Sequence, residues 1–116
     1  MTPENLPSII RHWIGGELVD AADGRTFDVC DPVSNTTYTQ AARGAAADVD
    51  RAVEAARAAF PQWAGLSNRA RANILNRIAD AVEARHDQLA AFETYDTGLP
   101  ITQARGQARR AAENFR

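Results

Sequence analysis

Two carboxylates lie three residues apart in the stretch ETYDTGLP, which runs from Glu93 to Pro100. Residues three apart are neighbours on a helix surface, so Glu93 and Asp96 could act as a general acid–base pair. Such a pair also needs a third group and a cleft, and the sequence supplies neither. A solvent-facing acidic turn is the simpler interpretation of this spacing.

Asp96 also stands where a helix is expected to end. Gly98 and Pro100 form an ordinary stop signal, a left-handed cap followed by a residue that cannot continue a helix. The end of a helix carries partial negative charge, so an anion there is unfavourable. A carboxylate beside unsatisfied terminal carbonyls is, however, a set of hard oxygen ligands. A bound cation is therefore an alternative to the solvated acidic turn.

The other reactive side chains suggest no catalytic device. His12 and His86 are far apart in the sequence, and we expect each on the surface or partly packed. Cys30 follows Val29 in an alternating strand pattern, and cysteine is among the most buried residue types. Because nothing basic stands beside it in the sequence, we do not expect Cys30 to be a nucleophile. The chain contains no GxGxxG, phosphate loop, HExxH or GxSxG motif, so no catalytic or coenzyme-binding residue is assigned.

Charge and composition favour an ordinary soluble protein. The 116 residues are 45% hydrophobic and 24% charged, and the net charge of −2 offers no basic field for nucleic acid or anionic lipid. The arginines of residues 104–116 lack interleaved aromatic side chains apart from Phe115, and Arg105 and Arg109 are spaced like a salt-bridged helix face. The chain has no apolar run of transmembrane length and no secretory signal, so we expect a cytoplasmic protein.

The first part of the chain, residues 1–45, has the pattern of strands and turns. Gly15-Gly16 separates two short apolar runs, as in a two-residue hairpin. Turns are predicted at Asp23-Gly24 and again from Asp31-Pro32, with a strand through Phe27 and Val29 between them and a further strand over 36–40. We expect a small antiparallel β-ribbon, which is marginal alone and needs a surface to lie against.

Residues 46–116 have helical periodicity and predict three or four α-helices. Asp48 is expected to cap the first helix, and Ser67 the second. Pro61 and the following Trp63-Ala64-Gly65 mark the expected end of the first helix. The third should stop at Gly98, and the fourth should cover about Ile101 to Phe115. The predicted apolar stripes of the first two helices are Val49, Ala52, Val53, Ala56, Phe60 and then Ala70, Ile74, Ile78, Ala81, Val82.

The order of these segments resembles the N-terminal section of the NAD(P)-dependent aldehyde dehydrogenases. The likeness runs from about His12 to Arg116 and rests on four segments in one order: IGGELVDAADGRTFDVCDP, DVDRAVEAARAAFPQWAGLSNRARANIL, ETYDTGLP and AAENFR. The resemblance implies an α/β parent fold, in which a β-ribbon and helices open the coenzyme domain of a much longer chain. The Rossmann core and the catalytic domain would then lie outside these 116 residues.

The resemblance also implies the activity of the parent enzyme, which oxidises an aldehyde to a carboxylic acid with NAD or NADP. The family's catalytic cysteine and glutamate lie later in the chain and match no residue here, so the 116-residue chain is expected to be inactive. The parent is expected to form a homo-oligomer. Leu99 after D-T-G, with Pro100-Ile101, resembles the hydroxymuconic-semialdehyde branch, while betaine-aldehyde and general aliphatic aldehyde activity remain open.

One family feature can be carried over by position. Many members hold a monovalent cation through backbone carbonyls before the Asn/Asp-Pro pair and through the aspartate of D-T-G. The matching positions here are Val29, Cys30 and Asp96, and the ion would be K⁺ or Na⁺. A stand-alone helical module that binds a partner protein through its exposed apolar stripe is the alternative from a different functional class.

Overall fold

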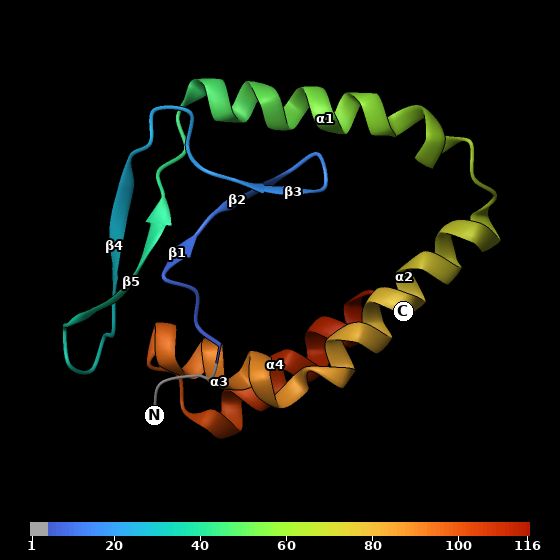
Figure 1. Cartoon of the computed structure of the whole chain (residues 1–116). Helices are drawn as coiled ribbons and strands as arrows, with labels where there is room; N and C mark the ends of the chain where they lie inside the picture. The colour runs from blue at the N-terminus through green and yellow to red at the C-terminus, as the bar shows by residue number, and fades with distance from the viewer. Residues whose placement is uncertain (1–4) are drawn as a thin grey trace. The chain divides into compact units, whose positions relative to one another are not determined.

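The computed structural model of the chain describes residues 5–116 and contains short strands followed by helices. The strands are β1 (Ile9–Ile10), β2 (His12–Ile14), β3 (Glu17–Val19), β4 (Thr26–Cys30) and β5 (Thr37–Ala42). The helices are α1 (Ala46–Ala64), α2 (Asn68–Ala84), α3 (His86–Thr97) and α4 (Ile101–Asn114) (Figure 1). No helix among the described residues is both long and apolar enough to cross a membrane.

The structure divides into two compact units, which we describe separately. The ribbon unit contains Pro7–Cys30 and Thr37–Gly65, and therefore all five strands together with α1. The helical unit contains Asp31–Thr36 and Leu66–Arg116, and therefore α2, α3 and α4. The turn Asp31–Thr36 thus groups with the helices, although the strands on either side of it do not.

Two small sheets form the ribbon unit. The predicted hairpin is confirmed, because β2 and β3 pair antiparallel around Gly15 and Gly16, which have φ of 64° and 87°. Such left-handed angles suit glycine, since it has no Cβ. The second sheet has the order β1-β5-β4, with β4 and β5 antiparallel and β1 parallel to β5. The parallel strand was not expected from the sequence, since β1 has only two residues.

The start of α1 differs from the prediction. Ala45 is the N-cap residue, and Asp48 lies three positions later. Asp48 reaches back to accept the backbone N–H of Ala45 at 3.0 Å, which is one half of a capping box. The predicted end, marked by Pro61 and the following Trp63-Ala64-Gly65, is confirmed, because the helix runs to Ala64 and Gly65 is its C-cap residue. Proline lacks one N–H, but here its position one turn before the end does not stop the helix.

In the helical unit, Ser67 caps α2 as predicted, because its hydroxyl accepts the N–H of Ala70 at 3.2 Å. The third helix ends at Gly98, also as predicted, with φ of 74°. The buried face of α2 is centred on Ala79, which is fully buried, whereas Ile78 of the predicted stripe is 38% exposed. The packed face is therefore rotated from the one that periodicity alone suggested.

Small residues make up the core of the described structure. The buried hydrophobic residues are all alanines, and no large side chain is fully buried. On α4, Ala104, Ala108 and Ala112 form one stripe at four-residue spacing, and α4 packs against both α2 and α3. Short side chains allow helices to approach closely. The buried alanines are Ala21, Ala42, Ala79, Ala90, Ala104, Ala108 and Ala112.

Candidate functional site

The end of α3 is closed by its own threonine and glycine. The Gly98 N–H donates to the carbonyl of Thr94 at 3.0 Å, and the Thr97 hydroxyl donates to the carbonyl of Glu93 at 2.7 Å. The same hydroxyl accepts the N–H of Leu99 at 3.2 Å. Two of the terminal carbonyls are therefore already hydrogen-bonded. Glu93 and Asp96 are both exposed, as a solvated acidic turn would be.

The turn Asp31–Thr36 lies against this helix end within the helical unit. A Cβ at Gly98 would be 3.4 Å from Cγ of Pro32, so the backbone approaches the proline ring closely. A side chain there would also need the left-handed conformation, which costs an L-residue about 1 to 2 kcal/mol. Glycine is thus favoured at residue 98 chiefly by its left-handed dihedral angles, since the contact with Pro32 is of ordinary van der Waals length.

The carboxylate of Asp31 holds the turn in shape. One oxygen accepts the Val33 N–H at 2.9 Å, and the other accepts the Ser34 hydroxyl at 2.7 Å. Since the Ser34 hydroxyl donates to Asp31, the Thr36 hydroxyl donates to Ser34 at 2.7 Å. The Val33 N–H, followed by the Ser34 hydroxyl, holds the pKa of Asp31 below its usual range. Asp31 is therefore a charged anchor at neutral pH.

Val29 and Cys30 lie at the end of β4, in the ribbon unit. The pairing of β4 with β5 shifts register between these two residues, as at a β-bulge. Such an irregularity disrupts the ladder and leaves a residue unpaired. Cys30 is exposed, with its sulfur 3.7 Å from the Thr37 hydroxyl, so the expectation of a buried cysteine is wrong. The face of the strand that carries Cys30 has no cover within the ribbon unit.

No cluster of three or more His, Cys, Asp or Glu side chains suited to a metal ion occurs among residues 5–116. The set suggested by the resemblance is of another kind, since it combines the backbone carbonyls of Val29 and Cys30 with one carboxylate. Val29 and Cys30 belong to the ribbon unit and Asp96 to the helical unit.

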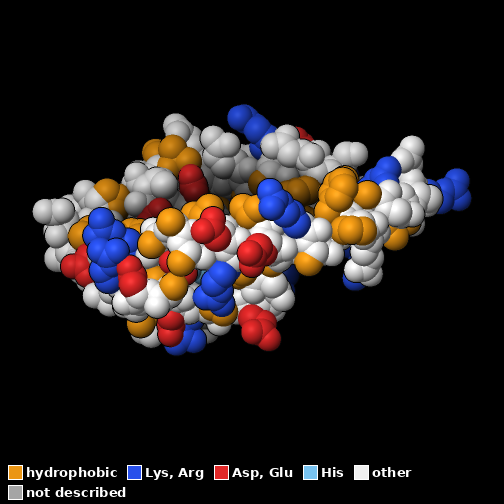
Figure 2. Space-filling view, turned by 90° about the horizontal axis from the view of Figure 1, so that it is seen from above, with side chains coloured by type: hydrophobic (Ala, Val, Ile, Leu, Met, Phe, Trp, Pro, Cys, Tyr) orange, Lys and Arg blue, Asp and Glu red, His pale blue; other side chains and the backbone are white. Residues whose placement is uncertain are grey.

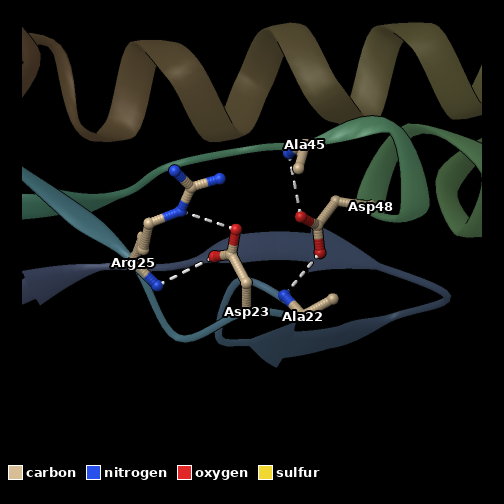
Figure 3. Close-up of polar contacts among 5 residues, drawn as sticks. All are labelled: Ala22, Asp23, Arg25, Ala45 and Asp48. Atoms are coloured by element: carbon tan, nitrogen blue, oxygen red, sulfur yellow. Dashed lines mark hydrogen bonds and ion pairs between the residues drawn. The ribbon is translucent and has the colours of Figure 1, made fainter.

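Asp48 is the most buried charged residue described, at 3% exposed, and its importance was underestimated from the sequence. One carboxylate oxygen accepts the Ala22 N–H at 2.9 Å, and the other accepts the Ala45 N–H at 3.0 Å (Figure 3). The side chain thereby ties the loop after β3 to the start of α1. The capping spacing pointed to Ala45, but nothing in the sequence pointed to Ala22, which is 26 residues away.

These hydrogen bonds determine the charge state of Asp48. The N–H of Ala45, and then that of Ala22, hold the pKa of Asp48 below its usual range, while burial acts in the opposite direction. The positive end of α1 also favours a carboxylate in the first helical turn. Asp48 is therefore ionised at neutral pH. Its role is structural, because it holds the loop after β3 to the start of α1.

The two histidines belong to different units. His12 belongs to β2 in the ribbon unit, with its ring close to Gly44, and His86 begins α3 in the helical unit. The His86 Nε2–H donates to the carbonyl of Arg105 at 2.9 Å and so joins α3 to α4. Both rings are half-buried. Together with the exposed Cys30, they form no catalytic arrangement within either unit.

Comparison with protein families gives a match to the aldehyde dehydrogenase family over residues 18–116. The fluoroacetaldehyde dehydrogenase of Streptantibioticus cattleyicolor is 44% identical over 93 residues. That alignment covers 80% of this chain but 18% of the relative. The chain therefore spans about a fifth of the length of such a relative.

Solved structures show the same similarity in three dimensions. HpcC of Thermus thermophilus superposes with a TM-score of 0.89 at 41% identity, covering 95% of this chain and 21% of that one. PnpE, solved in complex with nicotinamide adenine dinucleotide, superposes with a TM-score of 0.90 at 41% identity, covering 92% of this chain and 22% of that one. These matches support an enzyme family and give no support to a stand-alone interaction module. The short strands and four helices are a section of the aldehyde dehydrogenase fold, and the chain belongs to the aldehyde dehydrogenase family.

Proposed function

We propose that this chain is the N-terminal part of an NAD(P)-dependent aldehyde dehydrogenase, which oxidises an aldehyde to a carboxylic acid. The family match over residues 18–116 carries the proposal. The chain would supply scaffold and no catalytic group, because neither unit brings nucleophilic and basic side chains together. The similarity to PnpE, which was solved with NAD, favours NAD as the coenzyme.

The described residues do not themselves fit a dinucleotide. A glycine-rich phosphate site needs glycines at a turn from a strand into a helix. The positive-φ glycines are Gly15, Gly16 and Gly24 in turns among the strands, and Gly98 after a helix. The junction from β5 to α1 has only Gly44, followed by alanines. The coenzyme would therefore be held by later parts of the parent enzyme.

Joining the chain to the rest of a related enzyme tests this proposal. We expect a chimaera, in which residues 18–116 replace the matched section of the S. cattleyicolor enzyme, to oxidise fluoroacetaldehyde and form NADH. The unjoined 116-residue chain is expected to form none. A chimaera that folds, as judged by circular dichroism and a cooperative melt, but oxidises no aldehyde would contradict the proposal. NADH formation by the unjoined chain would contradict it as well.

The proposal includes a cytoplasmic homo-oligomer and leaves the aldehyde to be determined. The sequence Leu99-Pro100-Ile101 resembles the hydroxymuconic-semialdehyde branch, whereas the relative named above is a fluoroacetaldehyde dehydrogenase. Comparing these two aldehydes and betaine aldehyde as substrates of the longer protein, by their kcat/KM values, would decide between the branches.

A monovalent cation held by the carbonyls of Val29 and Cys30 and by Asp96 is the second part of the proposal. The proposal rests on the resemblance at these three positions and on the place of Asp96 in the last turn of α3, where helix carbonyls are oxygen ligands. Potassium and sodium prefer oxygen ligands of the kind that carbonyls and carboxylates offer.

For this cation site, we expect the longer protein to melt at a higher temperature in potassium chloride than in choline chloride. Asp96→Ala should abolish that difference, because it removes the one charged ligand. Glu93→Ala, at the neighbouring exposed carboxylate, is the matched control and should preserve the difference. A salt-specific shift that survives Asp96→Ala would count against the site.

A further inference from the structure

The turn between β3 and β4 contains the only Asp-Gly pair of the sequence, Asp23-Gly24, and the sequence has no Asn-Gly pair. The carboxyl group of an aspartate can be attacked by the backbone nitrogen of the next residue, since the two groups are held close together in one chain. Glycine at that next position has no side chain to obstruct the attack. Every other aspartate of the sequence precedes a larger residue. Steric resistance to this reaction is therefore lowest at Asp23-Gly24.

The products of the reaction follow from the atoms involved. When the nitrogen of Gly24 attacks Cγ of Asp23, a C–N bond forms, and the hydroxyl of the protonated carboxyl leaves with the amide proton as water. Water then opens the five-membered succinimide ring at one of its two carbonyl carbons. Opening at Cγ restores aspartate, whereas opening at the backbone carbonyl carbon gives isoaspartate, in which the main chain runs through Cγ. Since a hydroxyl has to leave, the ionised carboxylate does not react.

Two sets of hydrogen bonds in the turn oppose this reaction. The Gly24 N–H donates to the carbonyl of Ala21 at 2.8 Å, which holds the attacking nitrogen in the turn. One carboxylate oxygen of Asp23 accepts the Arg25 N–H at 2.9 Å, and the other accepts the Arg25 Nε–H at 2.7 Å (Figure 3). Both oxygens are thus bonded to Arg25, and hydrogen bonds from these donors favour the ionised carboxylate.

The contact with Arg25 determines the charge state of Asp23. The Arg25 N–H, followed by the Arg25 side chain, holds the pKa of Asp23 below its usual range. Acidic and basic side chains are interspersed over the face seen in Figure 2, and the net charge is −2, so no large field of one sign adds to this local effect. Both side chains are exposed, so water reaches the carboxylate. Loss of the Arg25 side chain should therefore raise the protonated fraction of Asp23 at mildly acidic pH.

We propose that Asp23-Gly24 is the site at which this chain forms isoaspartate, and that Arg25 slows the reaction. The reacting carbon and nitrogen both belong to the turn, and water is the only other reactant. The modification thus needs no enzyme and no coenzyme. This inference is independent of the proposed function, because it concerns the ribbon unit alone.

Isoaspartate at residue 23 would disturb the ribbon unit. Ala22 directly precedes the reacting residue, and its N–H donates to the buried carboxylate of Asp48 at 2.9 Å (Figure 3). On the other side, Arg25 leads directly into β4. An additional main-chain carbon between these two neighbours changes the spacing that the bond to Asp48 and the start of β4 require. We therefore expect the isomerised chain to melt at a lower temperature than the unmodified chain.

The first test compares the same 116-residue chain in its folded and unfolded states. One sample is kept in buffer and one in guanidinium chloride, both at the same mildly acidic pH, and isoaspartate is then counted by methyl transfer from S-adenosylmethionine with an isoaspartyl methyltransferase. We expect the denaturant to raise the rate of formation at least about tenfold, because it removes the hydrogen bonds from Arg25 to the charged carboxylate. Asp23→Glu should abolish most of the signal, since the longer side chain cannot form the five-membered ring. Equal rates in both samples, or an undiminished signal in Asp23→Glu, would overturn the proposal.

The second test removes the Arg25 side chain from the folded chain. Arg25→Ala should raise the rate of isoaspartate formation about two- to fivefold, the range expected for the loss of one exposed ion pair. Arg57→Ala, at an exposed arginine of α1 in the same unit, is the matched control and should leave the rate unchanged. Circular dichroism and melting check the fold, and if Arg25→Ala unfolds the chain, Arg25→Gln replaces it with the same expectation. A folded Arg25 variant that forms isoaspartate no faster than Arg57→Ala would overturn the proposal.

Discussion

Replacing Ala104 by leucine is expected to lower the free energy of unfolding of the chain by about 1 to 3 kcal/mol, the usual cost of overpacking a close-packed site. Ala104 is fully buried on the face of α4 that carries Ala108 and Ala112. The helices that α4 touches also present buried alanines, Ala79 of α2 and Ala90 of α3. Three additional carbon atoms cannot be accommodated there unless the helices move apart.

Thermal melting monitored by circular dichroism would measure this effect. For a unit of this size, each kcal/mol shifts the melting temperature by about 4 to 8 °C. Gln107→Leu is the matched control, because Gln107 is exposed on the same helix and leucine is equally compatible with helix. An unchanged melt in Ala104→Leu would mean that α4 does not pack through its alanine stripe.

Asp48→Asn is expected to destabilise the ribbon unit strongly at neutral pH. The two carboxylate oxygens accept two backbone N–H groups, those of Ala22 and Ala45. An amide has a single oxygen, so its NH₂ group would face one of these donors. Leaving a buried N–H without an acceptor is more costly than losing an exposed hydrogen bond. The melting temperature of the variant at pH 7 should therefore fall clearly below that of the parent chain.

The pH dependence of this difference has a definite sign. Because folding lowers the pKa of Asp48, the stabilisation is fully present above the ordinary aspartate pKa of about 3.9 and is lost as pH falls through the lower folded value. The gap between parent and Asp48→Asn melting temperatures should hence be constant near neutrality and shrink below about pH 4. Asp50→Asn, at an exposed residue of the same helix, is the matched control and should leave the melting temperature at pH 7 unchanged. If the difference between the two melting temperatures grew on acidification, it would contradict a stabilising role of the ionised Asp48 carboxylate.

Local signals in the sequence were enough to predict where most helices and strands begin and end. Gly15-Gly16 predicted the hairpin, Ser67 the start of α2 and Gly98 the end of α3, and all three are confirmed. Each of these depends on the conformational preference or hydrogen bonding of residues close in the chain. Pro61 and Trp63-Ala64-Gly65 marked the end of α1, and Pro61 lies inside the last turn because one missing hydrogen bond near the end of a helix is tolerated.

Contacts between distant residues could not be predicted in the same way. The parallel pairing of β1 with β5, the bond between Asp48 and Ala22, and the contact of Pro32 with Gly98 link parts of the chain that no periodicity relates. Cys30 was misplaced for the same reason, since alternation shows which residues share a face but not whether anything covers that face.

The sequence by itself determined the order of the strands and helices, because turns, caps and periodic stripes each depend on residues close together in the chain. It also determined the family, because the order of these segments along the chain is specific to that family. Only the tertiary structure decided which stripes are packed. The alanine stripe of α4 is buried within the helical unit, whereas Val49, Val53 and Phe60 of the stripe predicted for α1 are exposed. The physical reason is that burial of a hydrophobic face stabilises the protein only where another surface covers it. The residues of the face do not specify which surface that is.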